Sequence, residues 1–371
     1  MIAFFLNDHG AATTGSTTVI REELLGAADS GSGVIWLRRR LSWAQKFRTP
    51  WNGAFCYTIG FPRTWPLGRW FSYLQMAHIF RKHRVRLAHI HWSGVDHWGF
   101  ASYRGARPRF PYILTFHAFN ERRLRRMGLL EPGKLKSLMA SASKISAVSR
   151  SLKAELASFY PAVADKIQII ANGVRVESTG RPLPDGVPER FILSAGLLSH
   201  AKGSDLLLLA FFDLWREGKL RVPLVLCGQD EPKGQVQRLV DALRLKDVVI
   251  VLPDCPHEVV LSLMERCLFF VSATREESFG IAILEAMSCG KAVAAPRVGG
   301  IPEYLAHESN GLMFEPGDVE SFKKAVMRLA GDDALRRRLG REGALTASCF
   351  QWGEARASYG DMHKEILGAR R

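Results

Sequence analysis

The sequence has 371 residues, of which 47% are hydrophobic and 23% charged, and its formal net charge is +15. A globular chain of this length usually folds as two domains, and no apolar run approaches the roughly 18 residues that a membrane-spanning helix needs. The six cysteines are scattered and form no C-x-x-C pair. This pattern argues against a disulfide framework and favours the reducing cytoplasm.

The positive charge is concentrated in the first half of the chain. Residues 1–177 carry 26 Lys and Arg against 10 Asp and Glu, whereas the remaining residues carry 25 against 26. Basic clusters occur at 38–40, 81–86 and 121–136, and the last interleaves cations with Leu and Met, as suits an anionic membrane surface. Nucleic acid would attract the same charge. Zinc-finger spacing, RNP-like strands and stacking aromatics are absent, so we expect no nucleic-acid partner.

Apolar strand-like runs alternate with helix-length segments, which predicts an α/β fold with parallel sheets flanked by helices. The strands expected in a first sheet are 2–6, 87–91, 112–116, 144–148 and 167–170. Those expected in a second sheet are 192–195, 224–227, 248–252, 269–272 and 292–295. The Pro- and Gly-rich segment 178–188 is predicted to be a linker, so the two domains are expected at 1–177 and 189–353.

The first strand of the second domain leads into a basic loop. Gly196 follows this strand, and Lys202 and Gly203 precede a predicted helix. A glycine turn at a helix N-terminus leaves backbone N–H groups free for an anion. Lys202 would add a point charge that stabilises a departing diphosphate.

Two glutamates flank the start of a later helix. Glu277 and Glu285 are separated by seven residues, and an apolar helix is predicted to start near Ile281 and to stop at Gly290. The residues expected to offer loop and backbone groups to an anion are Ser278, Phe279, Gly280 and Ile281. Glu277 lies before the helix and Glu285 more than a turn inside it. The two carboxylates are therefore expected to have separate roles.

The segment 277–285 resembles the E-x7-E signature of glycosyltransferase family 4, whose members are retaining, nucleotide-sugar-dependent enzymes of the GT-B fold. Further segments follow in the family's order: 111–117, 145–149, 169–174, 192–206, 224–228, 268–272, 296–303, 310–318 and 350–352. The resemblance implies two Rossmann-like, doubly wound domains that face a cleft, with the last helix, 354–371, returning to the first domain. Ligands bind such sheets beyond the carboxyl ends of the strands.

The resemblance also implies roles for single residues. Glu277 would lie beside the transferred sugar as a catalytic group, and Glu285 would bind the ribose hydroxyls of the nucleotide. His117 matches a family histidine close to the sugar. Gly15 and Ser16 stand where the family has a Gly-rich diphosphate loop. The departing diphosphate would leave an oxocarbenium-like centre, which Glu277 and the His117 carbonyl would stabilise.

A histidine-rich strand invites a metal hypothesis. His89 and His91 share one strand face, and His97 follows them. Because no Asp, Glu or Cys stands at ligand spacing, we expect these side chains to line the acceptor site rather than to bind a metal. The chain also lacks a D-x-D motif. We therefore expect a basic site instead of a metal, and no further cofactor.

Some positions depart from the family pattern, and they leave alternatives open. Leu197 replaces an Arg that usually assists the lysine, with Arg297 and His200 as candidate substitutes. The other departures are Ser16 within a Gly-Gly pair, Arg175 for an Asp and Asp254 for a glycine. A catalytically inactive scaffold and a GT-B-fold nucleotide-sugar epimerase are therefore the alternative functions.

The expected function is a retaining, metal-independent hexosyltransferase. It would move a sugar from a nucleotide diphosphate sugar to a lipid-linked or cell-surface saccharide acceptor. Its expected location is the cytoplasm, with peripheral contact to the inner face of the membrane through the basic half.

Overall fold

A computed structural model describes residues 1–6, 22, 26, 33–39, 48–51, 54–59, 68–92, 110–119, 132–174, 180–230 and 234–369. These residues form two compact units. The first contains the described residues before Asn172 and those after Trp352, and the second is Asn172–Trp352. The chain therefore passes between the units twice.

The first unit is built on a largely parallel sheet. Its described strands are β1 Ile2–Leu6, β2 Val34–Arg39, β3 Arg48–Trp51, β4 Ala54–Ile59, β5 Leu87–Trp92, β6 Tyr112–Phe116, β7 Lys144–Ala147 and β8 Ile167–Ile169. They lie in the order β3-β4-β2-β1-β5-β6-β7-β8, and β3 pairs antiparallel with β4. Strands β5 and β6 are buried along their whole length, as expected of parallel strands covered on both faces.

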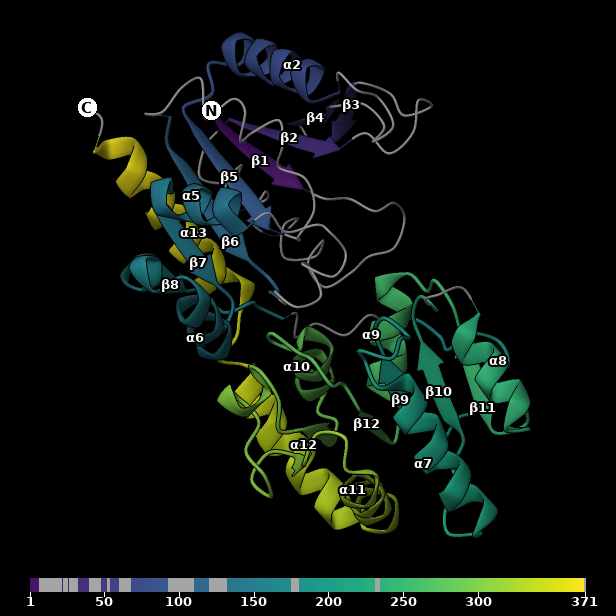
Figure 1. Ribbon diagram of the computed structural model, residues 1–371. Coiled ribbons are helices and arrows are strands. Elements are labelled where there is room, and N and C mark those ends of the chain that lie inside the picture. The colour runs from purple at the N-terminus through teal and green to yellow at the C-terminus, as the bar shows by residue number, and fades with distance from the viewer. Residues whose placement is uncertain are drawn as a thin grey trace. The chain divides into compact units, whose positions relative to one another are not determined.

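The described helices of this unit are α2 Gly68–Lys82, α5 Pro132–Ser141, α6 Arg150–Phe159, the 3₁₀ helix η1 Pro161–Lys166 and the C-terminal α13 Trp352–Gly368. Helix α6 starts where Ser149 Oγ accepts a hydrogen bond from Leu152 N at 3.1 Å, a standard N-cap. Helix α13 is tied to the sheet by an ion pair of 2.7 Å between Lys144 Nζ and Glu365 Oε1. Figure 1 shows α13 beside β5, β6 and β7.

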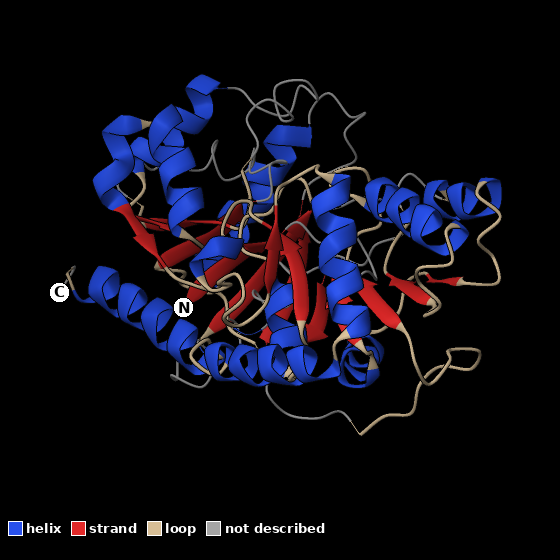
Figure 2. Ribbon diagram, turned by 90° about the horizontal axis from the view of Figure 1, so that it is seen from below, coloured by secondary structure: helices blue, strands red, loops and turns tan. Residues whose placement is uncertain are grey.

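The second unit is a fully parallel sheet in the order β11-β10-β9-β12-β13-β14. Its strands are β9 Ile192–Ala195, β10 Leu224–Cys227, β11 Val249–Leu252, β12 Phe269–Val271, β13 Val293–Pro296 and β14 Leu312–Phe314. The prediction of parallel sheets flanked by helices is confirmed in both units (Figure 2). Strands β2, β3, β4 and β14 were not predicted.

The strand order of the second unit places its helices. They are α7 Ser204–Arg216, α8 Gln235–Ala242, α9 His257–Arg266, α10 Ile281–Ser288, the 3₁₀ helix η2 Ile301–Glu303, α11 Val319–Gly331 and α12 Asp333–Ala347. The chain builds outward from β9 to β11 and then returns to add β12, β13 and β14 on the other side of β9. Because such crossovers are right-handed, α7 and α8 cover one face, and α9 and α10 cover the other. Helix α11 packs on α7, and α12 packs on α10.

The described residues include the predicted linker and part of the predicted basic clusters. The predicted linker is anchored within the second unit, because Ser262 Oγ donates hydrogen bonds to the carbonyls of Arg181 and Pro182 at 2.9 and 3.2 Å. Of the basic clusters, Arg81 and Lys82 are exposed at the end of α2, and residues 120–131 lie outside the described residues. None of the described helices is both long and apolar enough to cross a lipid bilayer.

Candidate functional site

The loops that follow β9 and β12 bring two predicted site residues together. Lys202 Nζ donates a hydrogen bond to Glu277 Oε2 at 2.7 Å. The Lys202 side chain is 36% exposed and that of Glu277 is 18% exposed, so the ion pair stays open to a ligand. Both residues lie beyond the carboxyl ends of parallel strands, where doubly wound sheets bind their ligands.

Arg275 holds these two loops in register, and sequence reasoning missed it. Its guanidinium donates to the His200 carbonyl at 2.6 Å and to both carboxylate oxygens of Asp205 at 2.7 and 3.0 Å. Burial opposes ionisation of Asp205, but the Arg275 hydrogen bond and charge outweigh it and lower the pKa of Asp205. The Arg275 backbone also donates to the Ala201 carbonyl at 2.9 Å. Arg275, which lies in the same loop as Glu277, thus holds the loop that carries Lys202 in position.

Two glycines permit the close backbone approaches on which this arrangement depends. Gly203 has φ 70°, and a Cβ there would lie 1.9 Å from the Ala273 carbonyl oxygen. Gly299 has φ 55°, and a Cβ there would lie 1.5 Å from the Glu277 carbonyl oxygen. A side chain at either position would push the Lys202 loop or the Glu277 loop out of place.

Helix α10 begins at Ile281, four residues after Glu277, with Gly280 as its N-cap residue. The Phe279 ring, which is 4% exposed, packs on Tyr304 with ring centroids 5.6 Å apart. Tyr304 Oη donates to the carbonyls of Phe279 and Gly280 at 2.9 and 3.1 Å. The predicted binding role of Phe279 can therefore involve only its backbone. The side chains of Ser278 and Ile281 are partly exposed.

Glu285 lies in the middle of α10 and is only 7% exposed. Its Oε1 lies 3.2 Å from Nε2 of His257, the first residue of α9. A buried carboxylate needs a partner, and His257 provides one. His257 could not be identified from local sequence, because its contact depends on the packing of α9 on α10.

The other predicted second-unit residues have less definite environments. Gly196 is exposed directly after β9. Leu197 follows Gly196 in that loop; of the two candidate substitutes for the Arg, Arg297 Nε pairs with Glu315 at 3.4 Å and the His200 side chain is 74% exposed. Gly15 and Ser16 lie outside the described residues.

In the first unit, His117 follows β6 and belongs to a histidine cluster, defined here as His89, His91, His117 and His363, of which His117 is partly exposed. His91 Nδ1 and His117 Nε2 are 2.9 Å apart, and His89 Nδ1 and His363 Nε2 are 3.0 Å apart. The rings of His89 and His91 stack with centroids 4.4 Å apart. His89 is 0% and His91 1% exposed, so the prediction that they line an acceptor site is wrong. His97 lies outside the described residues.

Metal binding finds no support in these contacts. Three hydrogen bonds join the cluster to itself and to β6: His89 Nδ1 with His363 Nε2, His91 Nδ1 with His117 Nε2, and His89 Nε2 with Thr115 Oγ1, the last at 2.7 Å. Among the described residues, no group of three or more His, Cys, Asp or Glu side chains is placed to hold a metal ion.

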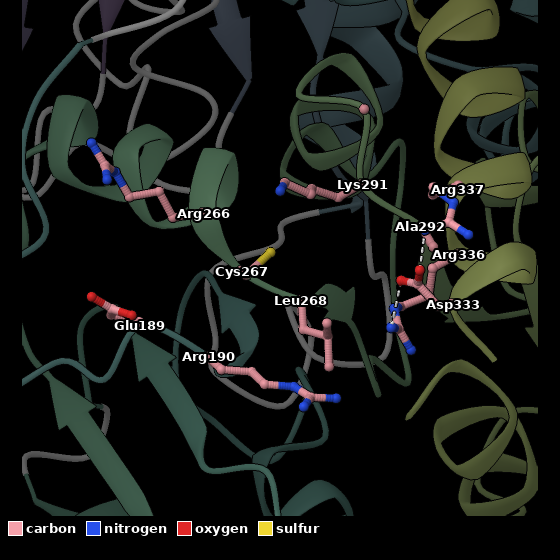
Figure 3. Close-up of a pocket in the computed structure, with 11 residues that line it drawn as sticks. Glu189, Arg190, Arg266, Cys267, Leu268, Lys291, Ala292, Asp333, Arg336 and Arg337 are labelled. Atoms are coloured by element: carbon pink, nitrogen blue, oxygen red, sulfur yellow. Dashed lines mark hydrogen bonds and ion pairs between the residues drawn. The ribbon is translucent and has the colours of Figure 1, made fainter. Parts of the chain in front are cut away.

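A basic cavity of about 250 Å³ lies at the amino-terminal ends of strands β9, β12 and β13 (Figure 3). It is lined by residues that precede β9, β12 and β13, whereas Lys202 and Glu277 follow their strands. Asp333 in this cavity is shared by Arg336 and Arg337. The cavity is therefore separate from the Lys202–Glu277 site.

Comparison with known proteins gives a consistent result. The model of Glycosyltransferase Family 4 matches residues 13–178, and that of Glycosyl transferases group 1 matches residues 182–346. The D-inositol 3-phosphate glycosyltransferase of Streptomyces avermitilis is 26% identical over 338 residues, which are 85% of this chain and 70% of that protein.

Solved structures share the whole fold. Sucrose-phosphate synthase from Thermosynechococcus elongatus matches with a TM-score of 0.84 at 20% identity, covering 99% of both chains. HepE from Anabaena in complex with UDP-glucose matches with a TM-score of 0.75 at 18% identity, covering 98% of this chain and 99% of HepE. With both halves matched by their family models, this chain belongs to glycosyltransferase family 4 and is a glycosyltransferase of the GT-B fold.

Proposed function

We propose that this glycosyltransferase moves a hexose, with retention of configuration, from a nucleotide diphosphate sugar to a lipid-linked or cell-surface saccharide acceptor. The observation that carries the proposal is the 2.7 Å contact between Lys202 and Glu277. It places a cation and a carboxylate directly before α10, whose N-terminus favours phosphate. A diphosphate and the sugar attached to it need these two kinds of group side by side.

The proposed roles follow from the chemistry of each group. Lys202 binds the diphosphate and stabilises it as a leaving group, so that no metal ion is required. Glu277 stabilises the positive charge that develops on the sugar, and Glu285, held by His257, accepts hydrogen bonds from the ribose hydroxyls. His117 of the first unit contacts a sugar. The structure of HepE with UDP-glucose makes UDP-glucose the first donor to test.

The acceptor proposal depends on the charge of the first half of the chain. Residues 1–177 have 16 more Lys and Arg than Asp and Glu, which favours an anionic acceptor or the anionic inner face of a membrane. A relative named for D-inositol 3-phosphate also suggests an anionic acceptor. Anionic lipid extracts and D-inositol 3-phosphate are therefore the two acceptors to compare.

The test measures nucleotide release and product formation from UDP-glucose and GDP-mannose, with each acceptor and with EDTA present. We expect one donor to be consumed in an acceptor-dependent reaction that survives EDTA, and NMR of the product to show the anomeric configuration of the donor. Glu277→Gln should abolish the reaction. Release of an isomerised sugar without acceptor would instead identify an epimerase. Weak donor binding with neither sugar transfer nor donor hydrolysis would identify an inactive scaffold.

A further inference from the structure

One ring nitrogen of His117 has no hydrogen-bond partner within the described part of the chain. His117 Nε2 is hydrogen-bonded to His91 Nδ1 at 2.9 Å, whereas His117 Nδ1 is buried and has no hydrogen-bond partner among the described residues. A buried polar atom without a partner destabilises the folded state. That cost is recovered when a ligand supplies the missing partner, so Nδ1 is the atom that His117 offers to a ligand.

Whether His117 Nδ1 donates or accepts a hydrogen bond depends on which ring nitrogen carries the proton. Burial lowers the pKa of His117 to about 4, so its ring is neutral at physiological pH and carries one N–H. If His91 donates to His117 Nε2, the proton of His117 lies on Nδ1, which is then a donor. If His117 donates from Nε2, then Nδ1 is an acceptor. The direction of the His91–His117 hydrogen bond therefore determines the role of Nδ1.

The packing of His91 keeps its ring in place for the hydrogen bond to His117. It lies in β5, is 1% exposed, and stacks on His89 and on Phe4 with ring centroids 4.4 and 6.1 Å apart. The His91 and His117 rings are themselves almost parallel, with 12° between their planes. A buried ring packed in this way has little freedom to turn.

We propose that His91 is a positioning residue that fixes the tautomer of His117, and thereby decides whether His117 Nδ1 donates a hydrogen bond to a sugar oxygen or accepts one from a sugar hydroxyl. The proposal rests on the proposed function only in naming a sugar as the group that His117 meets. It assigns to His91 of the histidine-rich strand β5 a role that involves no metal.

The test uses ¹⁵N NMR of histidine-labelled protein, because the two ring nitrogens of a neutral imidazole give different shifts in each tautomer. His117→Asn identifies the His117 signals. We expect one tautomer in the unmodified protein and in His363→Phe, a matched control within the cluster. His91→Phe keeps an aromatic ring but loses the hydrogen bond, so it should give a mixture or the opposite tautomer. An unchanged His117 tautomer in His91→Phe would overturn the proposal.

A second variant separates positioning from packing. The amide of His91→Asn can replace the hydrogen bond of Nδ1, so it should retain more activity on UDP-glucose than His91→Phe, in which we expect a loss of about 10- to 100-fold in kcat/KM. Equal losses in both variants would mean that His91 only fills space, and would contradict the proposal. If no protein turns over UDP-glucose, the proposed function is in question, but the NMR result still decides the role of His91.

Discussion

Lys202 Nζ lies 2.7 Å from Glu277 Oε2, although the two residues are 75 positions apart in the sequence. Each lies in a different strand-to-helix connection of the second sheet. In the protein without donor, each charge is the other's partner. A diphosphate would compete with Glu277 for Lys202 and leave the carboxylate free to face the sugar.

Removing the Lys202 charge should weaken donor binding more than it weakens the fold. Charge-assisted hydrogen bonds contribute about 1.5–3 kcal/mol, so Lys202→Ala should reduce UDP affinity about 10- to 100-fold. Because the Lys202–Glu277 pair is partly exposed, the melting temperature should change little. Lys202→Arg should retain part of the affinity. Isothermal titration calorimetry with UDP measures these effects, and equal affinity in Lys202→Ala and the unmodified protein would remove Lys202 from the site.

Arg275 should affect the site through loop position. Arg275→Lys loses the bidentate contact with Asp205 and should lower the free energy of unfolding by about 1 kcal/mol while also weakening UDP binding. The matched control is Arg328→Lys, since Arg328 also contacts both carboxylate oxygens of one acid, Glu308. Urea unfolding and calorimetry should show a stability loss in both variants and weaker UDP binding in Arg275→Lys only. Unchanged UDP binding in Arg275→Lys would contradict its role in holding the loop.

A methyl group at Gly203 should disrupt the Lys202 loop. Gly203→Ala places a Cβ 1.9 Å from the Ala273 carbonyl oxygen and also strains a backbone with φ 70°. Gly290→Ala is the control, because Gly290 has φ 69° but no atom within 4 Å of the added Cβ. Both variants have the backbone cost of about 1–2 kcal/mol, so any excess loss in Gly203→Ala measures the clash. Urea unfolding that gives equal losses would show that the loop moves freely.

The histidine cluster should make the first unit sensitive to acid. Burial lowers the pKa of His117 and of His363 to about 4, and burial together with neighbouring His363 and His117 holds the pKa of His89 well below its ordinary value. Between pH 6.5 and about 4 the unfolded chain binds protons that the folded chain excludes. The free energy of unfolding is therefore not reduced by these histidines above pH 6.5. It decreases as the pH falls through this window, by up to about 1.4 kcal/mol per pH unit for each histidine.

Urea unfolding between pH 7.5 and 4.5 measures this dependence. His363→Gln removes one of the three imidazoles whose pKa is lowered, so its free energy of unfolding should decrease less steeply with falling pH than that of the unmodified protein. Identical slopes in the two proteins would show that His363 does not titrate in this way.

The sequence predicted those parts of the fold that carry a strong local signal. Strands β5, β6 and β9 are apolar runs of buried parallel strands, and their periodicity is visible without neighbours. Strands β2 and β3 contain Arg and Pro residues, and β14 has only three residues. They are strands because a neighbouring strand pairs with them, and this tertiary effect cannot be seen in a local window.

The residues of the candidate site divide in the same way, into those with a local sequence signal and those that depend on tertiary packing. The positions of Lys202 and Glu277 could be predicted because both stand at fixed offsets from a strand and a helix start. Arg275 and His257 were missed because their partners, Asp205 and Glu285, are distant in sequence. His89 and His91 were correctly placed on one strand face, but their partners on β6 and α13 determine that they are buried.

The central claim, that the second unit binds a nucleotide diphosphate sugar, is tested most directly by thermal unfolding with UDP, GDP, ADP and TDP. Glu285→Ala is the site variant, and Glu320→Ala, at an exposed position of α11, is the control. A ligand at 100 times its dissociation constant stabilises the folded state by about 2.7 kcal/mol. We expect one nucleotide to raise the melting temperature of the unmodified and Glu320→Ala proteins but not that of Glu285→Ala. No shift with any nucleotide, or the same shift in Glu285→Ala, would contradict the account.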